Sequence, residues 1–165
     1  GLETVDSPIE RHISRMFAPD EAPYAETLTS GPCRGIVTSA KIASLYNGAL
    51  RDLDEVRAAA EGGPVMVYGF TPFAYLYLDL PYGSHGAWYD GDLARAFAYW
   101  RKFPARRPVC VYAPLFDNLY WASYKDLSFA VSREGFARKV LADLEDLGAF
   151  DARFGEAGVI LRAIG

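Results

Sequence analysis

Two short apolar runs, each opened by a proline, constrain the fold of this chain more than any other feature. They are Pro64-Val65-Met66-Val67-Tyr68 and Pro108-Val109-Cys110-Val111-Tyr112. Neither run alternates apolar with polar residues, and unbroken runs of this length are typical of strands that are buried on both faces of a sheet. Because both faces of such a sheet must be covered, we expect helices to pack on either side of these strands.

Amphipathic helices are predicted around the two strands. Between residues 40 and 61, apolar residues recur at alternating steps of four and three, the pattern of a helix with one buried face. Ser39 is a suitable N-cap, Gly62-Gly63 ends the helix, and Gly48 weakens it and indicates a kink. Three further helices are predicted, from Pro72 to about Leu78, from Asp92 through Trp100, and from Glu134 to Leu147.

The order of these elements predicts an α/β fold. Gly35–Thr38 is expected to form a first short strand, and the residues from Ala152 to Ile164 a terminal hairpin. Alternating strands and helices are typical of a three-layer sandwich with a mostly parallel central sheet, and we expect the antiparallel hairpin at one edge of it. Residues 1–30 are expected to be a connector packed on the domain, and residues 31–165 a single α/β domain.

Composition excludes several classes of protein. The chain has 165 residues, of which 51% are hydrophobic and 23% charged, and these values exclude a disordered chain. Its net charge of -4 argues against nucleic-acid binding, which usually leaves a basic stripe. No apolar run approaches the roughly 18 residues that a membrane span requires. Because the chain begins at Gly1 rather than methionine, we expect that an upstream region has been removed.

The motifs of cofactor, metal and catalytic sites are missing from the sequence. It contains neither G-x-G-x-x-G nor a P-loop pattern, so no cofactor is expected. Cys33 and Cys110 are the only cysteines and form no Cys/His cluster, so no metal is expected. They are interpreted as two buried thiols, with a bridge between them as the alternative. Ser84 and His85 are adjacent, and neighbouring side chains rarely align for proton transfer, so no residue is assigned a catalytic role.

A band of aromatic and polar residues after the first buried strand is the best candidate for a ligand site. In open α/β sheets, ligands bind beyond the carboxyl ends of the strands, where we expect this band to lie. Aromatic faces beside polar groups suit a sugar or a protein surface, although the rings could instead cover the sheet or dock on a neighbouring domain. The candidate ligand-binding residues are Tyr75, Tyr77, Asp79, Tyr82, His85 and Trp88.

Several stretches of the chain carry a resemblance to a known class of domain. Gly31-Pro32-Cys33-Arg34-Gly35-Ile36-Val37-Thr38-Ser39 fits the pattern G-P-x-x-G-[IL]-x-T-S. Further matching stretches are Pro64–Tyr68, Tyr75-Leu76-Tyr77 with Asp79, Ala87-Trp88, Tyr99-Trp100, Pro104, Pro108 and Gly158-Val159-Ile160-Leu161. From about Gly31 to Leu161, the chain resembles the C-terminal soluble domain of polytopic bacterial membrane proteins of the glycosyltransferase C superfamily type.

The resemblance implies a non-catalytic domain on the extracytoplasmic side of the cell membrane, which caps a membrane active site or contacts an acceptor glycan. In that superfamily the catalytic acid lies on a loop among the membrane helices, so no catalytic residue is carried over. The implied partners are the upstream transmembrane region of the same parent chain and a glycan or lipid-linked sugar, without nucleic acid. Two other functions stay open. One is a free-standing, hydrolase-like α/β enzyme that uses His85 with Asp79 or Asp90, and the other is a pure protein-docking module.

Overall fold

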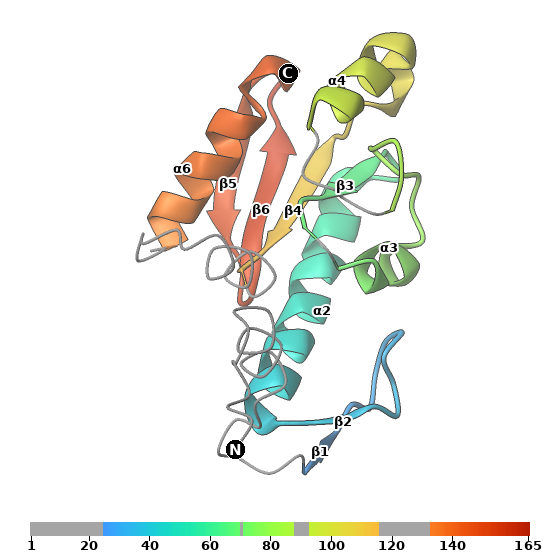
Figure 1. Cartoon of the computed structure of the whole chain (residues 1–165), viewed down its shortest axis with the longest axis vertical. Helices are drawn as coiled ribbons and strands as arrows, with labels where there is room; N and C mark the ends of the chain where they lie inside the picture. The colour runs from blue at the N-terminus through green and yellow to red at the C-terminus, as the bar shows by residue number, and fades with distance from the viewer. Residues whose placement is uncertain (1–24, 70, 88–92, 116–132) are drawn as a thin grey trace, which may run out of the picture.

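A four-stranded mixed sheet forms the centre of the computed structural model, which describes residues 25–69, 71–87, 93–115 and 133–165 (Figure 1). The strand order is β3-β4-β6-β5. Strands β3 and β4 are parallel, whereas β6 runs antiparallel to both β4 and β5. The four strands are β3 (Val65–Val67), β4 (Cys110–Pro114), β5 (Phe150–Phe154) and β6 (Gly158–Ala163).

The α/β class and the antiparallel hairpin at one edge of the sheet are confirmed, but the expectation of a mostly parallel sheet is corrected. Only one of the three strand pairs in the central sheet is parallel. The short strand predicted at Gly35–Thr38 is not part of this sheet, because β2 (Val37–Thr38) pairs with β1 (Glu26–Thr27) in a separate antiparallel pair. The first four residues of β6 are buried, so this strand takes an inner position beside β4, and an apolar run alone does not reveal strand direction.

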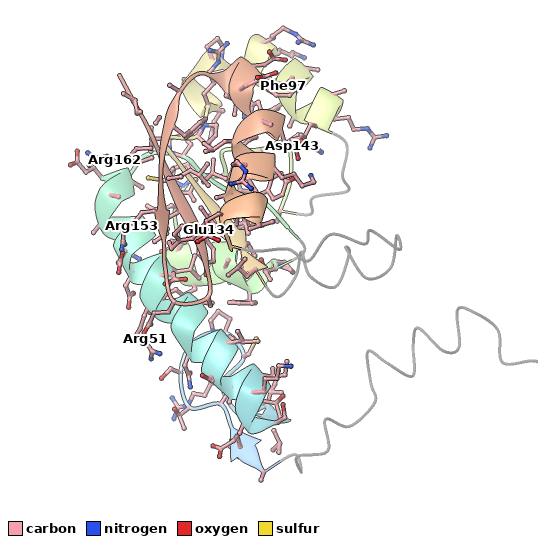
Figure 2. The ribbon with its side chains drawn as sticks, turned by 90° about the vertical axis from the view of Figure 1, so that its left-hand side faces the viewer. Arg51, Phe97, Glu134, Asp143, Arg153 and Arg162 are labelled. Atoms are coloured by element: carbon pink, nitrogen blue, oxygen red, sulfur yellow. The ribbon has the colours of Figure 1, made fainter. Side chains whose placement is uncertain are left out.

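Helices cover both faces of the sheet, as the sequence predicts. On one face lie α2 (Ala40–Ala60) and α3 (Phe73–Leu78), and on the other lie α4 (Leu93–Lys102) and α6 (Arg133–Asp143). Val111 of β4 packs with α4 and α6, while its neighbour Tyr112 packs with α2 and α3. Figure 2 shows α2 and α6 on opposite sides of the strands. The side chains of each strand thus alternate between two apolar clusters, which is the arrangement of a three-layer sandwich.

The long helix α2 begins and ends close to where the sequence predicts. The hydroxyl of Ser39 accepts a hydrogen bond from the backbone N–H of Ile42, and Glu61 adopts a left-handed conformation with φ of 50° that ends the helix. Helix α2 continues without interruption past Gly48, from Ala40 to Ala60, so this glycine does not break the helix. At Gly48 the helix lies against the turn between β5 and β6, close to Glu156 and Ala157.

The other elements follow the predictions with small differences at their ends. Helix α6 ends at Asp143, four residues earlier than expected, and a short 3-10 turn, η2 (Glu145–Leu147), completes the segment. A second 3-10 turn, η1 (Pro104–Arg106), precedes β4. Both cysteines are free, with Cys110 buried and Cys33 partly buried. Among the described residues, no helix has the length and apolar character needed to cross a bilayer. Most of the predicted connector, residues 1–24, lies outside the described residues.

Candidate functional site

Tyr75, the first of the predicted ligand-binding residues, lies in the core. Its side chain is only 5% exposed, and its hydroxyl accepts a hydrogen bond from the backbone N–H of Val67 at 2.8 Å. The same hydroxyl lies 3.3 Å from the hydroxyl of Ser84. Burial raises the pKa of Tyr75, so the phenol stays neutral at physiological pH. Tyr75 therefore joins α3 to the edge of the sheet and is not available to stack on a ligand.

Tyr82 lies on the outer edge of β3, beside the first residue of that strand. Val65 donates a backbone hydrogen bond to the carbonyl of Pro81 at 3.0 Å and accepts one from Gly83 at 2.7 Å. The ring of Tyr82 packs on Tyr75 with centroids 4.6 Å apart and is 38% exposed. The expectation that Tyr82 lies beyond the carboxyl end of the strand is corrected, because the chain turns back after α3 and pairs Tyr82 with Val65, the first residue of β3.

Tyr77 joins α3 to α2, and Asp79 ends α3. The hydroxyl of Tyr77 donates to Asp54 Oδ1 at 2.8 Å, and the guanidinium of Arg57 lies 4.8 Å from the centre of its ring. The hydrogen bond to the Asp54 carboxylate raises the pKa of Tyr77. Asp79 is exposed in a left-handed conformation, and its backbone N–H caps the end of α3 by donating to the carbonyl of Tyr75 at 3.2 Å. Both residues therefore have roles in the structure of α3 and its packing, and neither forms a shared site with Tyr82.

His85 is exposed on the loop that follows Tyr82. In the described part of the chain it makes no hydrogen bond or ion pair with an acidic residue, so a pair of His85 with Asp79 is not assembled. Trp88 and Asp90 lie outside the described residues. Across the described segments, no group of His, Cys, Asp and Glu is arranged to hold a metal ion. Of the six candidates, the structure brings together Tyr75 and Tyr82 at the edge of β3.

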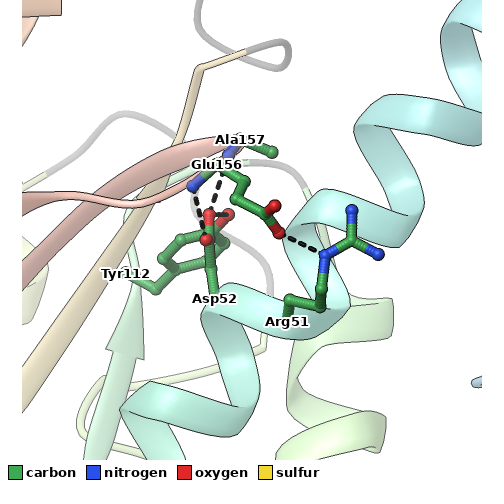
Figure 3. A network of polar contacts seen from close by, with 5 residues as sticks. All are labelled: Arg51, Asp52, Tyr112, Glu156 and Ala157. Carbon is green, nitrogen blue, oxygen red and sulfur yellow. Dashed lines mark hydrogen bonds and ion pairs between the residues drawn. The ribbon is translucent and has the colours of Figure 1, made fainter.

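A buried carboxylate that the sequence reasoning missed is the most highly connected polar group of the core (Figure 3). Asp52, on α2, is 1% exposed and accepts hydrogen bonds from the Tyr112 hydroxyl at 2.8 Å and from the backbone N–H of Ala157 at 2.9 Å. The backbone N–H of Glu156 donates to its other oxygen at 2.6 Å. Burial and the adjacent carboxylate raise the pKa of Tyr112 far above its usual range. The network fastens the turn between β5 and β6 to α2.

One sequence signal could have revealed this carboxylate. Asp52 is three residues after Ala49 and four before Val56, so it lies on the buried face of the predicted helix. A buried acidic residue must be paired or hydrogen-bonded, which indicates a polar network in the core. Its partners could not be inferred from the sequence, since Ala157 is more than 100 residues away along the chain.

A cleft between α4 and η2 is the second feature that the sequence reasoning missed. Its volume is about 490 Å³, and it combines an aromatic wall with charged groups of both signs. Figure 2 labels Phe97 on α4 and Asp143, the last residue of α6, at the same end of the molecule. The residues that line the cleft are Ala94, Phe97, Trp100, Arg101, Arg107, Asp146 and Leu147.

Comparisons of the chain with family models, with curated proteins and with solved structures found no match.

Proposed function

We propose that this chain is a non-catalytic accessory domain that acts by binding, on the extracytoplasmic side of a membrane glycosyltransferase-like protein. The proposal that the domain is non-catalytic rests on one observation, which is that its buried polar side chains form hydrogen bonds within the protein. Both oxygens of Asp52 accept hydrogen bonds from the hairpin turn and Tyr112, and the hydroxyl of Tyr75 is held by Val67. A catalytic acid or base must instead face its substrate. These groups support the fold.

The proposed membrane setting rests on the sequence resemblance. The segment of residues 31–39, which carries part of that resemblance, has a structural role in the fold. Gly31 and Gly35 have φ of 69° and 92°, a conformation that favours glycine. The hydroxyl of Tyr46 donates to the carbonyl of Ser30 at 2.9 Å and accepts from the backbone N–H of Cys33 at 3.0 Å. The segment therefore shapes the turn that leads into α2, which is a reason for its residue pattern independent of catalysis.

We propose that the acceptor glycan contacts the edge of β3 through Tyr82 and His85, with Trp88 as a further candidate. Tyr82 presents part of its ring to solvent while Tyr75 supports the other part, and an aromatic ring held in this way suits stacking on a sugar. The exposed imidazole of His85 can hydrogen-bond to sugar hydroxyls beside it. In this proposal Tyr75 is a positioning residue, and Tyr77 and Asp79 are not in contact with the glycan.

Titration of the chain with soluble gluco-, manno- and galacto-oligosaccharides, followed by calorimetry, tests this proposal. Tyr82→Ala and His85→Ala should each weaken binding about tenfold, since each removes one contact with the sugar. Leu76→Ala is the matched control, because Leu76 is exposed on α3 and lies outside the proposed glycan surface. Unchanged affinity of Tyr82→Ala, or no binding of any oligosaccharide, would reject the glycan surface. Hydrolysis that disappears in His85→Ala would favour the enzyme alternative instead.

Docking onto the rest of its parent protein is a second candidate function, and one observation favours it. Ile36, just before β2, and Val37, on β2, are 53% and 54% exposed, and Ile42 in the first turn of α2 is also exposed. Grouped exposed apolar residues are typical of surfaces that bind another protein. If this surface docks on the parent protein, the double variant Ile36→Ser, Val37→Ser should no longer co-purify with the separately expressed remainder. Leu76→Ser, which alters an exposed apolar residue elsewhere, should co-purify as before.

A further inference from the structure

The segment from α4 to the start of β4 is basic, although the chain as a whole is acidic. Residues 93–109 contain five basic residues and no acidic one, while the chain has a net charge of -4. Arg101, Arg106 and Arg107 are exposed there, and none of them forms an ion pair within the described residues. Their positive charge is therefore available to a ligand.

Two of these arginines face a cleft whose aromatic wall is held in place. Arg101 comes from α4 and Arg107 from the residue after η1, and both line the cleft of about 490 Å³. The indole N–H of Trp100 donates to the carbonyl of Gly83 at 2.8 Å, and the ring of Phe97 packs edge-on against it with centroids 5.4 Å apart. Because the wall is fixed by these contacts, a ligand would not have to order it on binding.

Asp146 lines the same cleft from η2 and adds a hydrogen-bond acceptor opposite in charge to the arginines. A carboxylate can accept hydrogen bonds from hydroxyl groups but repels a bare anion. The cleft thus offers three kinds of contact: two guanidinium groups, an aromatic face and an acceptor. Its volume lies within the range of sites that bind small molecules.

We propose that this cleft binds a phosphate monoester carried on a hydroxylated ring, such as a sugar phosphate. Two guanidinium groups match the double negative charge of a phosphate monoester, and each can donate two parallel hydrogen bonds to its oxygens. The apolar face of the ring packs on Phe97, which the buried ring of Trp100 supports from behind, and its hydroxyls donate to Asp146. The same group occurs on soluble sugar phosphates and on lipid headgroups. This site is separate from the edge of β3, so the proposal does not rest on glycan binding there.

Calorimetric titration of the 165-residue chain with glucose 1-phosphate, inorganic phosphate and glucose tests the proposal. Glucose 1-phosphate should bind more tightly than either of the other two, since it alone uses all three contacts. Arg101→Gln and Arg107→Gln should each weaken its binding about tenfold or more. Asp146→Ala should weaken the binding of glucose 1-phosphate and strengthen that of inorganic phosphate, because it removes both a hydroxyl acceptor and a repelling charge.

Arg106→Gln is the matched control, because Arg106 is exposed next to Arg107 but does not line the cleft. Its binding of glucose 1-phosphate should change less than twofold. An equal loss in Arg106→Gln and Arg107→Gln would overturn the proposal, since it would show diffuse attraction to a basic surface.

Cosedimentation with vesicles distinguishes the two sources of the ligand. Binding to vesicles that contain phosphatidylinositol 4-phosphate but not to phosphatidylcholine vesicles, lost in Arg101→Gln and Arg107→Gln, would assign a headgroup ligand to the cleft. Binding of soluble glucose 1-phosphate alone would assign a soluble one. If the chain binds neither glucose 1-phosphate nor the vesicles that contain phosphatidylinositol 4-phosphate, the proposal is overturned, whatever the outcome of the oligosaccharide titration at Tyr82.

Discussion

Asp52 is the single residue on which the packing of the hairpin against α2 depends most. Replacing it with alanine removes the acceptor for the Tyr112 hydroxyl and for the backbone N–H groups of Glu156 and Ala157. Each buried donor left without a partner costs about 1–3 kcal/mol. We therefore expect Asp52→Ala to lower the free energy of unfolding by about 3 kcal/mol or more. Urea denaturation followed by circular dichroism measures this change.

Asp54 provides the matched control on the same helix. Its exposed carboxylate pairs with Arg57 at 3.0 Å and accepts the Tyr77 hydroxyl at 2.8 Å, and exposed polar contacts of this kind contribute little to stability. Asp54→Ala should therefore lower the free energy of unfolding by less than about 1 kcal/mol. Tyr112→Phe should cost about 1 kcal/mol, because it removes one hydrogen bond and leaves Asp52 with its backbone donors. Equal effects of Asp52→Ala and Asp54→Ala would show that the buried network is not a major support of the fold.

At the scale of elements, hydrophobic patterning predicts most helices and inner strands but not their partners. The stripe from residue 40 to 61 and the two apolar runs correspond to α2, β3 and β4, because burial of one face or of both faces leaves a local pattern. The pairing of β2 with β1 and the place of β6 beside β4 depend on contacts between segments distant in the chain. Local patterns do not encode such contacts.

The candidate site, too, could be predicted only as far as local sequence patterns reach. Aromatic residues after the first strand could be recognised, but their division between the core, the contact with α2 and the edge of β3 could not. A tyrosine has the same local signature whether its hydroxyl is used inside the protein or presented to a ligand. The cleft was missed because Arg101 and Asp146 come from segments far apart in the sequence.

The contact between α2 and the hairpin turn gives a prediction that belongs to the element scale. A Cβ atom added at Gly48 would lie 3.4 Å from the Cβ atoms of Ala157 and Glu156, a distance that needs little adjustment. Alanine in a helix interior is more favourable than glycine by about 1 kcal/mol. We expect Gly48→Ala to raise the free energy of unfolding by about 0.5–1 kcal/mol, measured as a higher urea midpoint.

The opposite result is expected on the other side of the same contact. At Gly155 an added Cβ would lie 2.3 Å from Asp52 Oδ1, so the carboxylate would have to leave its hydrogen-bond donors. Gly155→Ala should therefore destabilise the protein by about 2 kcal/mol or more. A loss of stability in Gly48→Ala would show instead that the helix and the turn are too closely packed for a methyl group.

At the scale of the whole molecule, the buried phenols and the buried thiol make stability sensitive to alkaline pH. Burial raises the pKa of Tyr46, Tyr75 and Cys110, and burial together with Asp52 raises that of Tyr112. In the unfolded chain these groups lose their protons near their ordinary pKa values, about 10 for tyrosine and about 8.5 for cysteine. Above those values the folded state holds more protons than the unfolded state, so the free energy of unfolding falls as pH rises.

The stabilisation that these protonated groups give to the folded state should therefore be fully present at neutral pH and should disappear progressively above about pH 9. Each such group that is protonated only in the folded state lowers the free energy of unfolding by about 1.4 kcal/mol per pH unit. Urea denaturation at a series of pH values from 7 to about 10.5 measures the slope. Tyr112→Phe should be less stable at pH 7 but should show a shallower decline at high pH, because one titrating phenol is gone. A free energy of unfolding that stays constant up to about pH 10.5 would mean that these groups ionise as readily in the folded protein as in the unfolded chain. An unchanged slope in Tyr112→Phe would mean the same for Tyr112 alone.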